Sequence, residues 1–552
     1  MSSVHAGGAE NLGLNRPHAP IASASPRAIF VAADVSLHPD KVDPTLRSPR
    51  CLQGRLRART VAVGLPGALL ATFAAAGAVH ADGGYYQGAL GARASGRAGA
   101  FVARADDFTA VEYNPAGLAD LKGTLIQLGN RLSYNAYGYT RAPTLDYGHQ
   151  QNGMAPQVRF STALNSKNWQ ALEPMLGVAS KLGLQDWGFA LGAYAPPGNA
   201  NESFPQDGGQ RYMMVDRQAV ILKYVASVAW KYRETFGIGV TFEWIHVPRL
   251  DYSLIIDGTP SPRADNPVTS SLDILATTRG SSKFTPNGVV GAWFRPTRSW
   301  QFGAAGQVIP AQIVTHSTLS VQPYSTTIGA IQLSRPATAQ RNANDVTVTL
   351  PLPLMARLGG RYRHFDGDRE LFDVELDVEY ETWSRAQQFT VATNGLRATA
   401  AGFSFDINDI IIPKAWQNTL SVKVGSDVLI FPRRWVMRAG AFYETAVSPA
   451  ANSNVDFPGG PQQGVTLGTS LLFGHLELAL AYQMRLMSEV NVSESQGRVY
   501  QQVPGSPCAA PYTDTTNCNA NLMGRPAPVV NAGRYQAVTH FLSLGLLFRF
   551  GT

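Results

Sequence analysis

Acidic side chains occupy every second position of one short segment. They are Asp373, Glu375, Asp377, Glu379 and Glu381. Neighbouring carboxylates can act as general acids and bases, so a hydrolase is the first activity to test against the sequence. A serine hydrolase would favour a Gly-x-Ser-x-Gly turn, yet that turn is absent and the ten His residues are scattered. We therefore expect that the chain is not an enzyme and needs no cofactor.

Basic side chains form a second row in the segment just before the acidic one. Arg357, Arg361 and Arg363 take the phase opposite to that of Leu358 and Tyr362. On adjacent strands the basic and acidic rows would face each other and form ion pairs. Such rows could line a polar conduit or stiffen a wall, and we favour the stiffening role.

Two of the three cysteines, Cys508 and Cys518, lie close together in a polar stretch. In an exported protein this pair predicts a disulfide within a loop. A metal site would need further His or Cys ligands, and residues 489–534 contain no others. We therefore expect no metal site.

Alternation of apolar with small, polar or charged residues is the main structural signal. It covers residues 235–244, 372–382, 475–486 and 542–550. A β-strand sorts such residues onto two faces, whereas a helix does not. The alternating segments are about twice as long as the usual strand of roughly five or six residues, which favours a membrane barrel over a β-sandwich.

Six short connections alternate with seven long polar ones. The short ones lie near residues 184–186, 231–234, 295–299, 365–369, 432–434 and 473–475, and the long ones near 142–173, 197–215, 254–270, 316–345, 391–415, 447–463 and 489–534. Trp187, Trp230, Trp300 and Trp435 flank four short connections, as an interfacial aromatic girdle would. Short turns on one side and long loops on the other are typical of bacterial outer-membrane barrels. We predict an all-β fold, a 14-stranded antiparallel transmembrane β-barrel over residues 123–552, with its charged rows facing the lumen.

An apolar run at residues 60–79 follows Arg55, Arg57 and Arg59 and ends in small residues. It predicts a secretory signal peptide over residues 55–81, cut after Ala81; a membrane anchor is the alternative. Residues 1–54 carry no periodicity, and we interpret them as a disordered extension or a start site assigned too far upstream. The net charge of +7 includes this leader, so it gives no reason to expect a nucleic-acid partner.

The segment before the barrel carries the most specific motif. Residues 91–120 read GARASGRAGAFVARADDFTAVEYNPAGLAD, and the chain later contains Pro351-Leu352-Pro353 and, at 380–384, YETWS. In these features, and in its strand layout, the chain resembles the outer-membrane long-chain fatty acid transporter family of the FadL type. The resemblance covers essentially all of residues 82–552, and the family includes importers of aromatic hydrocarbons.

The resemblance implies a barrel whose lumen is plugged by an N-terminal hatch, here residues 82–122. Asn114, Pro115 and Ala116 match the hatch motif. The resemblance also implies sideways release of ligand through an inward kink in the third strand, here about residues 187–197. Gly192 and Pro196, with Gly188 and Pro197, are residues that weaken strand pairing there. A plain strand that ends at a loop is the alternative.

The expected function is uptake of long-chain fatty acids or similar hydrophobic molecules across the cell outer membrane. A fatty-acid carboxylate would need a basic partner, and Arg249 and Arg385 are the candidates. The alternatives are an importer of aromatic hydrocarbons or alkanes in the same family, an outer-membrane hydrolase, and a general porin, which would need no plug. The expected partners are the hydrophobic substrate and outer-membrane lipids, and we expect a monomer.

We predict that the mature protein begins at Asp82, because the apolar run ends in small residues that suit signal peptidase. N-terminal sequencing of protein from isolated outer membranes checks this. A mature chain that retains residues 60–79 would contradict the signal-peptide interpretation.

Overall fold

The computed structural model describes residues 88–551, except 146–151, 153, 155, 171–172, 197, 199–200, 257–272, 325–328, 337–340, 401, 408, 458 and 502–528. The chain divides into two units, Met1–Ala75 and Ala76–Thr552, and every described residue belongs to the second. The predicted signal peptide at 55–81, Pro197, Cys508 and Cys518 lie outside the described residues.

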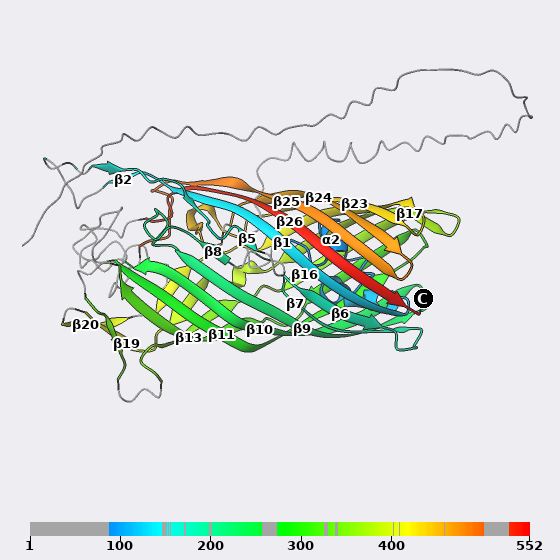
Figure 1. Ribbon diagram of the computed structural model, residues 1–552, viewed down its shortest axis with the longest axis horizontal. Coiled ribbons are helices and arrows are strands. Elements are labelled where there is room, and N and C mark those ends of the chain that lie inside the picture. The colour runs from blue at the N-terminus through cyan, green and yellow to red at the C-terminus, as the bar shows by residue number, and fades with distance from the viewer. Residues whose placement is uncertain are drawn as a thin grey trace, which may run out of the picture. The chain divides into compact units, whose positions relative to one another are not determined.

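Fourteen antiparallel strands form a closed barrel among the described residues. Eight are continuous: β1 (Thr124–Arg141), β9 (Asp216–Tyr232), β10 (Phe236–Ile256), β11 (Ile274–Phe294), β23 (Trp435–Glu444), β24 (Gln462–Phe473), β25 (Leu476–Val492) and β26 (Gly533–Phe550). The first and last strands, β1 and β26, pair along their whole length, from Thr124 opposite Phe550 to Arg141 opposite Gly533 (Figure 1). The predicted 14-stranded barrel is confirmed.

The other six barrel strands are interrupted. The second consists of β4 (Ala163–Leu164), β5 (Trp169–Gln170) and β6 (Met175–Ser180); the third of β7 (Trp187–Tyr194) and β8 (Asn201–Ser203); the seventh of β12 (Trp300–Gln307) and β13 (Gln312–Pro323); the eighth of β15 (Asp345–Pro351) and β16 (Met355–Asp366); the ninth of β17 (Arg369–Glu381) and β18 (Gln388–Ala392); the tenth of β21 (Ile410–Pro413) and β22 (Thr419–Phe431). Five of these interruptions lie in the third and the seventh to tenth strands. They separate a regular half near the short turns from a more irregular half near the long loops.

Small elements in the long connections lie beside the barrel strands. β2 (Thr144–Leu145) pairs with β3 (Gln157–Val158), and β14 (Gln332–Ser334), β19 (Leu396–Ala400) and β20 (Phe403–Ile407) form a three-stranded sheet. Two 3-10 turns, η4 (Trp383–Arg385) and η5 (Ala450–Asn452), lie between barrel strands. All six predicted short connections are confirmed, since each joins two strands that pair with each other. No helix among the described residues is long and apolar enough to cross a membrane.

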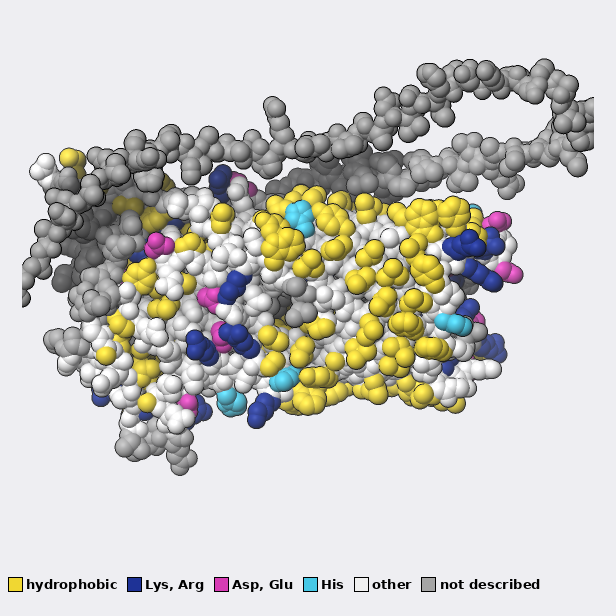
Figure 2. Space-filling view, viewed as in Figure 1, with side chains coloured by type: hydrophobic (Ala, Val, Ile, Leu, Met, Phe, Trp, Pro, Cys, Tyr) yellow, Lys and Arg dark blue, Asp and Glu magenta, His cyan; other side chains and the backbone are white. Residues whose placement is uncertain are grey.

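The two faces of each strand differ as the alternation predicts. On β17 the side chain of Glu375 is fully buried inside the barrel, whereas its neighbour Leu376 is 50% exposed on the outside. Apolar side chains gather in a broad band over the outer surface, and charged side chains lie at its borders (Figure 2). An apolar band of this kind matches the hydrocarbon layer of the outer membrane.

Residues 88–121, here called the N-terminal segment, form no strand. They contain α2 (Ala92–Ser95), α3 (Ala110–Tyr113) and η2 (Pro115–Asp120), and almost all of their side chains are buried. Inward-facing glycines on several strands make room for this segment. An added Cβ would lie 2.2 to 2.7 Å from the segment at Gly239, Gly291, Gly303, Gly425 and Gly440. The segment therefore packs directly against the inner surface of the barrel, and its role as a plug stays a prediction.

The acidic row of β17 holds the N-terminal segment in place. Asp377 accepts hydrogen bonds from the backbone N–H groups of Phe101 and Val102 at 2.7 and 2.9 Å. Glu375 accepts two more, from Ala103 and Arg104, at 2.7 and 3.2 Å.

The buried guanidinium of Arg97 reaches three carboxylates: Asp373 at 2.7 Å, Glu375 at 2.9 Å and Asp427 at 2.7 Å. The predicted pairing with the basic row also forms, as Arg357–Glu379 at 2.7 Å and Arg361–Asp373 at 2.5 Å. The acidic row therefore pairs with the basic row, as predicted, and in addition binds a segment far away in the sequence; its stiffening role stays a prediction.

We predict that Arg97→Met destabilises the folded barrel by about 3–5 kcal/mol, because it leaves buried carboxylates without their guanidinium. The control is Arg397→Met, which removes one side of an exposed ion pair with Asp406 and should cost about 1 kcal/mol or less. Urea unfolding in lipid vesicles, together with trypsin cleavage at Arg104, measures both effects. Equal stability of the two variants would contradict the anchoring role of Arg97.

Candidate functional site

A large cavity of about 600 Å³ lies inside the half of the barrel near the long loops. Most of its lining is apolar and comes from strands that are far apart in the sequence. These residues include Ala219, Ile221, Leu250, Leu254, Ala276, Ile313, Leu319, Val348, Leu350, Leu352, Phe389, Val391, Ile410, Ile412 and Phe457. Pockets of this size and composition suit small hydrophobic ligands.

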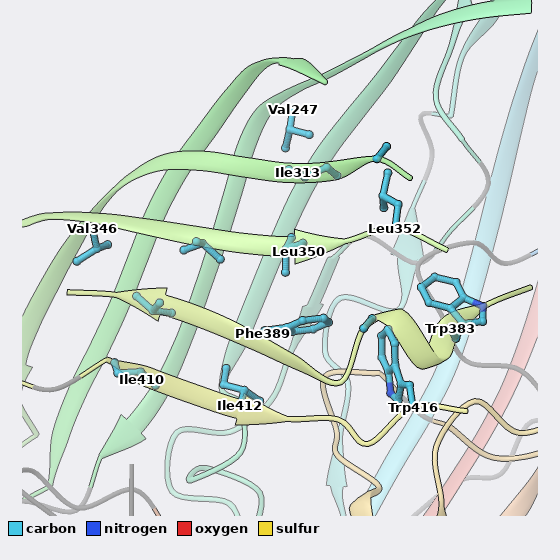
Figure 3. Close-up of a cluster of buried hydrophobic side chains, with 14 of the residues drawn as sticks. Val247, Ile313, Val346, Leu350, Leu352, Trp383, Phe389, Ile410, Ile412 and Trp416 are labelled. Atoms are coloured by element: carbon cyan, nitrogen blue, oxygen red, sulfur yellow. The ribbon is translucent and has the colours of Figure 1, made fainter. Parts of the chain in front are cut away.

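The interrupted strands produce the apolar wall of the large cavity. β13, β15, β18 and β21 each turn an apolar row inward, and these rows pack into one cluster (Figure 3). Pro310, Pro351, Pro353 and Pro413 lie at or next to three of the four interruptions, where their missing N–H groups break the ladder. The wall is therefore charged near the short turns and apolar near the long loops.

Two tryptophans lie beside this cluster, at the level of the interruptions. Trp383 and Trp416 are fully buried, and their rings meet edge to face at 5.2 Å. Phe389 contacts the ring of Trp416 at 5.4 Å and that of Phe457 at 5.7 Å. These large aromatic side chains lie between two zones of the wall. They separate the apolar rows, which are near the long loops, from the charged rows, which are near the short turns.

The large cavity also reaches the outer surface of the barrel through the third strand. β7 pairs with β9 as far as Tyr194 opposite Lys223, and pairing resumes only at Asn201 opposite Gln218. Among the described residues, none of the third strand therefore pairs with residues 219–222 of β9. Ala219 and Ile221 face inward and Val220 and Leu222 face outward, yet all four line the same cavity.

We call this gap the side opening. Pro196 and Ala195 lie at its edge, and the N–H of Ala195 donates to the carbonyl of Pro174 at 2.9 Å, which extends the pairing between the second and third strands. Trp169 lines the cavity from the second strand and is 62% exposed. Among the described residues, the pairing of the third strand with β9 stops at Tyr194 and resumes at Asn201, and an inward kink of this strand stays a prediction.

A smaller charged cavity of about 60 Å³ lies next to the large one and shares Pro196 with it. Here Lys223 forms ion pairs with Glu112 at 2.9 Å and with Glu243 at 3.1 Å. The hydroxyl of Tyr194 donates to Glu112 at 2.6 Å. Burial raises the pKa of Glu112, but Lys223 and Arg357 outweigh this effect and hold the pKa below its usual range. The last residue of β7 is therefore bonded to the N-terminal segment.

Asn114, Pro115 and Ala116 lie away from the large cavity. The amide of Asn114 donates to the carbonyls of Val102 and Ala292, both at 2.9 Å, and its oxygen accepts from the N–H of Ala116 at 3.2 Å. The indole of Trp293 donates to the carbonyl of Ala116 at 3.0 Å. These contacts fix the fold of the segment and its attachment to β11.

Gly192 lies in a fully paired part of β7, opposite Gly177 on one side and Val225 on the other. An added Cβ would lie 2.4 Å from the ring of Phe108. We had interpreted Gly192 as a residue that weakens the strand; its position instead admits an aromatic side chain of the N-terminal segment.

Arg249 and Arg385 do not line the large cavity. A bulge between Val247 and Leu250 shifts the phase of β10, so that Leu250 faces the cavity while Arg249 is half-exposed and pairs with Asp251 at 2.7 Å. Arg385 is exposed at the end of η4, next to the buried Trp383. The basic residue among the described residues of the cavity wall is Arg217, which no sequence pattern singles out.

The sequence also left the apolar lining of the large cavity unassigned. Apolar alternation close to a proline, as in residues 346–353, was the available signal. It could not show which rows meet across the barrel.

Comparisons with known proteins agree with the barrel fold. The sequence profile of the outer membrane protein transport protein family (OMPP1/FadL/TodX) matches residues 67–527. A FadL homologue of Pseudomonas aeruginosa is similar in structure, with 18% identity, a TM-score of 0.64 and coverage of 85% of this chain and 100% of the other. The toluene transporter TodX of Pseudomonas putida has 13% identity, a TM-score of 0.53 and coverage of 84% and 99%. The toluene transporter TbuX of Ralstonia pickettii has 13% identity, a TM-score of 0.51 and coverage of 84% and 98%. No curated protein sequence matches the chain significantly.

We predict strong coupling between Gly177 and Phe108. An added Cβ at Gly177 would lie 2.2 Å from the Phe108 ring, so Gly177→Ala should cost about 1–3 kcal/mol of unfolding free energy. In a double-mutant cycle with Phe108→Ala, the combined loss should be smaller than the sum of the two single losses. The control is Gly360→Ala, whose Cβ would have its nearest neighbour at 3.7 Å. Additive losses would show that Phe108 does not pack against this glycine.

Proposed function

This chain belongs to the outer membrane protein transport family of FadL and TodX, and we propose that it releases its hydrophobic substrate sideways into the membrane through the side opening. Members of this family are outer-membrane transport proteins for hydrophobic molecules and not enzymes. In the proposed route, the substrate enters the large cavity from the side of the long loops. It then passes Val220 and Leu222 to reach the hydrocarbon layer.

One observation carries this proposal. Inward-facing Ala219 and outward-facing Val220 line one continuous cavity. In a closed sheet, the two faces of a strand line separate spaces, because the hydrogen-bonded neighbours seal the wall. At residues 219–222 no described residue of the third strand pairs with β9, which supports a route between the lumen and the outer face at this place.

The energetics of a hydrophobic substrate favour this route. Each buried CH₂ group contributes about 0.8 kcal/mol, so an acyl chain or a hydrocarbon gains by staying in contact with apolar surface. The large cavity and the membrane provide such surface without interruption. A path along the lumen would instead lead through the ion pairs of Arg97, Lys223 and Arg357.

The N-terminal segment closes that second path in our proposal. It fills the lumen between the large cavity and the short turns, and it is held by hydrogen bonds to Glu375 and Asp377. Asn114 and Ala116 contribute to this role by fixing the segment to β11, and not by contact with substrate. Pro196 contributes by ending the pairing of β7, and Gly192 by admitting Phe108.

We predict that Leu222→Trp lowers uptake of a labelled hydrophobic substrate at least about tenfold, which corresponds to a barrier raised by about 1.4 kcal/mol. Leu222 faces outward, so a larger side chain there obstructs the side opening and leaves the lumen unchanged. Uptake is measured in cells with matched surface levels of each variant.

The matched control is Val228→Trp, which faces outward from the same strand where β7 and β10 seal both sides. It should transport at the wild-type rate. If Leu222→Trp also transports at that rate, sideways release is wrong and passage along the lumen past Asn114 becomes the better account.

A further inference from the structure

The charged side chains around the large cavity are balanced in sign. Among the described residues that line it, one is acidic, Glu173, and one is basic, Arg217. Glu173 lies 2.5 Å from the guanidinium of Arg131, which also stacks over the ring of Phe541. Glu173 is thus already paired with a cation.

Arg217 is likewise engaged. Its guanidinium lies 3.3 Å from the carboxylate of Glu202 and 4.2 Å from the centre of the Phe457 ring, and it donates to the backbone carbonyl of Asp456. The carboxylate of Asp456 forms an ion pair with Lys414, and both side chains are buried. The two cations on this side of the cavity, Arg217 and Lys414, therefore face two anions, Glu202 and Asp456.

The adjoining charged cavity is balanced in the same way. Its lining contains four basic and four acidic side chains. They are Lys223, Arg357, Lys423 and Arg485, and Glu112, Glu379, Glu381 and Glu444. Lys423 pairs with Glu379 at 3.0 Å and Arg485 with Glu444 at 2.5 Å, in addition to the pairs of Lys223 and Arg357 already described. Counted over the described residues, neither cavity beside the side opening thus has a surplus of positive charge.

We propose that the substrates of this protein are uncharged hydrophobic molecules, such as hydrocarbons, esters and alcohols, and not carboxylates. This inference rests on the proposed transport function and narrows its substrate class. The uncharged polar groups of such a ligand can form hydrogen bonds with Gln170, Asn201 and Thr278, which line the cavity. Fatty acids are the substrates expected from the sequence. Their binding is disfavoured at neutral pH, because their carboxyl groups are ionised there.

The physical reason is the cost of an unpaired buried charge. A carboxylate in the large cavity would have to compete with Glu202 for Arg217, so that two anions share one guanidinium. Taking an ion out of water without a free partner costs several kcal/mol, whereas a neutral molecule pays no such penalty. Arg249 and Arg385 cannot compensate, because neither lines the cavity.

Two ligands with the same acyl chain, one with an uncharged head group and one with a charged head group, test this inference. We compare methyl dodecanoate with dodecanoate at pH 8 on the full chain in lipid nanodiscs, with empty nanodiscs as the correction for partitioning. The ester should bind at least about tenfold more tightly, as expected for a charge that loses its solvation without a partner. Equal or tighter binding of dodecanoate overturns the inference and leaves the proposed function intact. Binding of neither ligand, together with no uptake of either by cells, overturns the proposed function itself.

Glu202→Gln provides a gain-of-function test, because it removes the anion that pairs with Arg217. Dodecanoate should then bind about tenfold more tightly than to the wild type, while binding of the ester stays unchanged. Glu489→Gln, on the exposed part of β25 away from both cavities, is the control and should leave both affinities unchanged. Unchanged binding of dodecanoate by folded Glu202→Gln overturns the role of charge balance.

A second comparison needs no variant. If the cavities are neutral, dodecylamine should bind as poorly as dodecanoate, and dodecanol should bind as well as the ester. Tight binding of dodecylamine would reveal a surplus of negative charge and would also overturn the inference.

Discussion

The interior of this barrel depends on one constraint, namely that a charge buried beneath the membrane surface must meet an opposite charge or a hydrogen-bond donor. The carboxylates of β17 meet this requirement by binding Arg97 and four backbone N–H groups of the N-terminal segment. The segment is held because the wall needs its donors, and the wall is stable because the segment supplies them. Because of the same constraint, no cation among the described residues of the large cavity is available to bind an anionic ligand. The charge of a ligand therefore matters there.

A second feature, the interruption of strands by proline, converts part of this charged wall into an apolar one. Between the short turns and the breaks, inward positions carry Asp, Glu and Arg. Between the breaks and the long loops, inward positions carry Ile, Val, Leu and Phe. The third strand breaks at Pro196 at the level where these two zones meet. A gap nearer the long loops would open onto those loops, and a gap nearer the short turns would open onto ion pairs. At this level, it connects an apolar cavity with an apolar membrane.

Much of this arrangement follows from local pattern in the sequence. Alternation predicted the strands and their inward acidic face, and the turn and loop lengths predicted the strand number, because both are properties of short segments. The contact of Arg97 with Asp373 joins residues 276 positions apart, and no local pattern contains it. Arg249 is a candidate carboxylate partner from its place near the outer end of the fifth strand, but a bulge in β10 shifts the phase there and Arg249 does not line the cavity. Gly192 was interpreted by its propensity alone, whereas its position is explained by Phe108, a neighbour from another element.

The central claim is that substrate crosses the wall at residues 219–222 of β9. Photo-crosslinking tests it most directly, with benzoylphenylalanine placed at outward-facing Val220 or, in the closed part of the same strand, at Val228. During uptake of a labelled hydrocarbon, the account predicts strong labelling of the protein through position 220 and only background labelling through position 228. Equal labelling at the two positions, with strong labelling from a probe at Asn114, would contradict it.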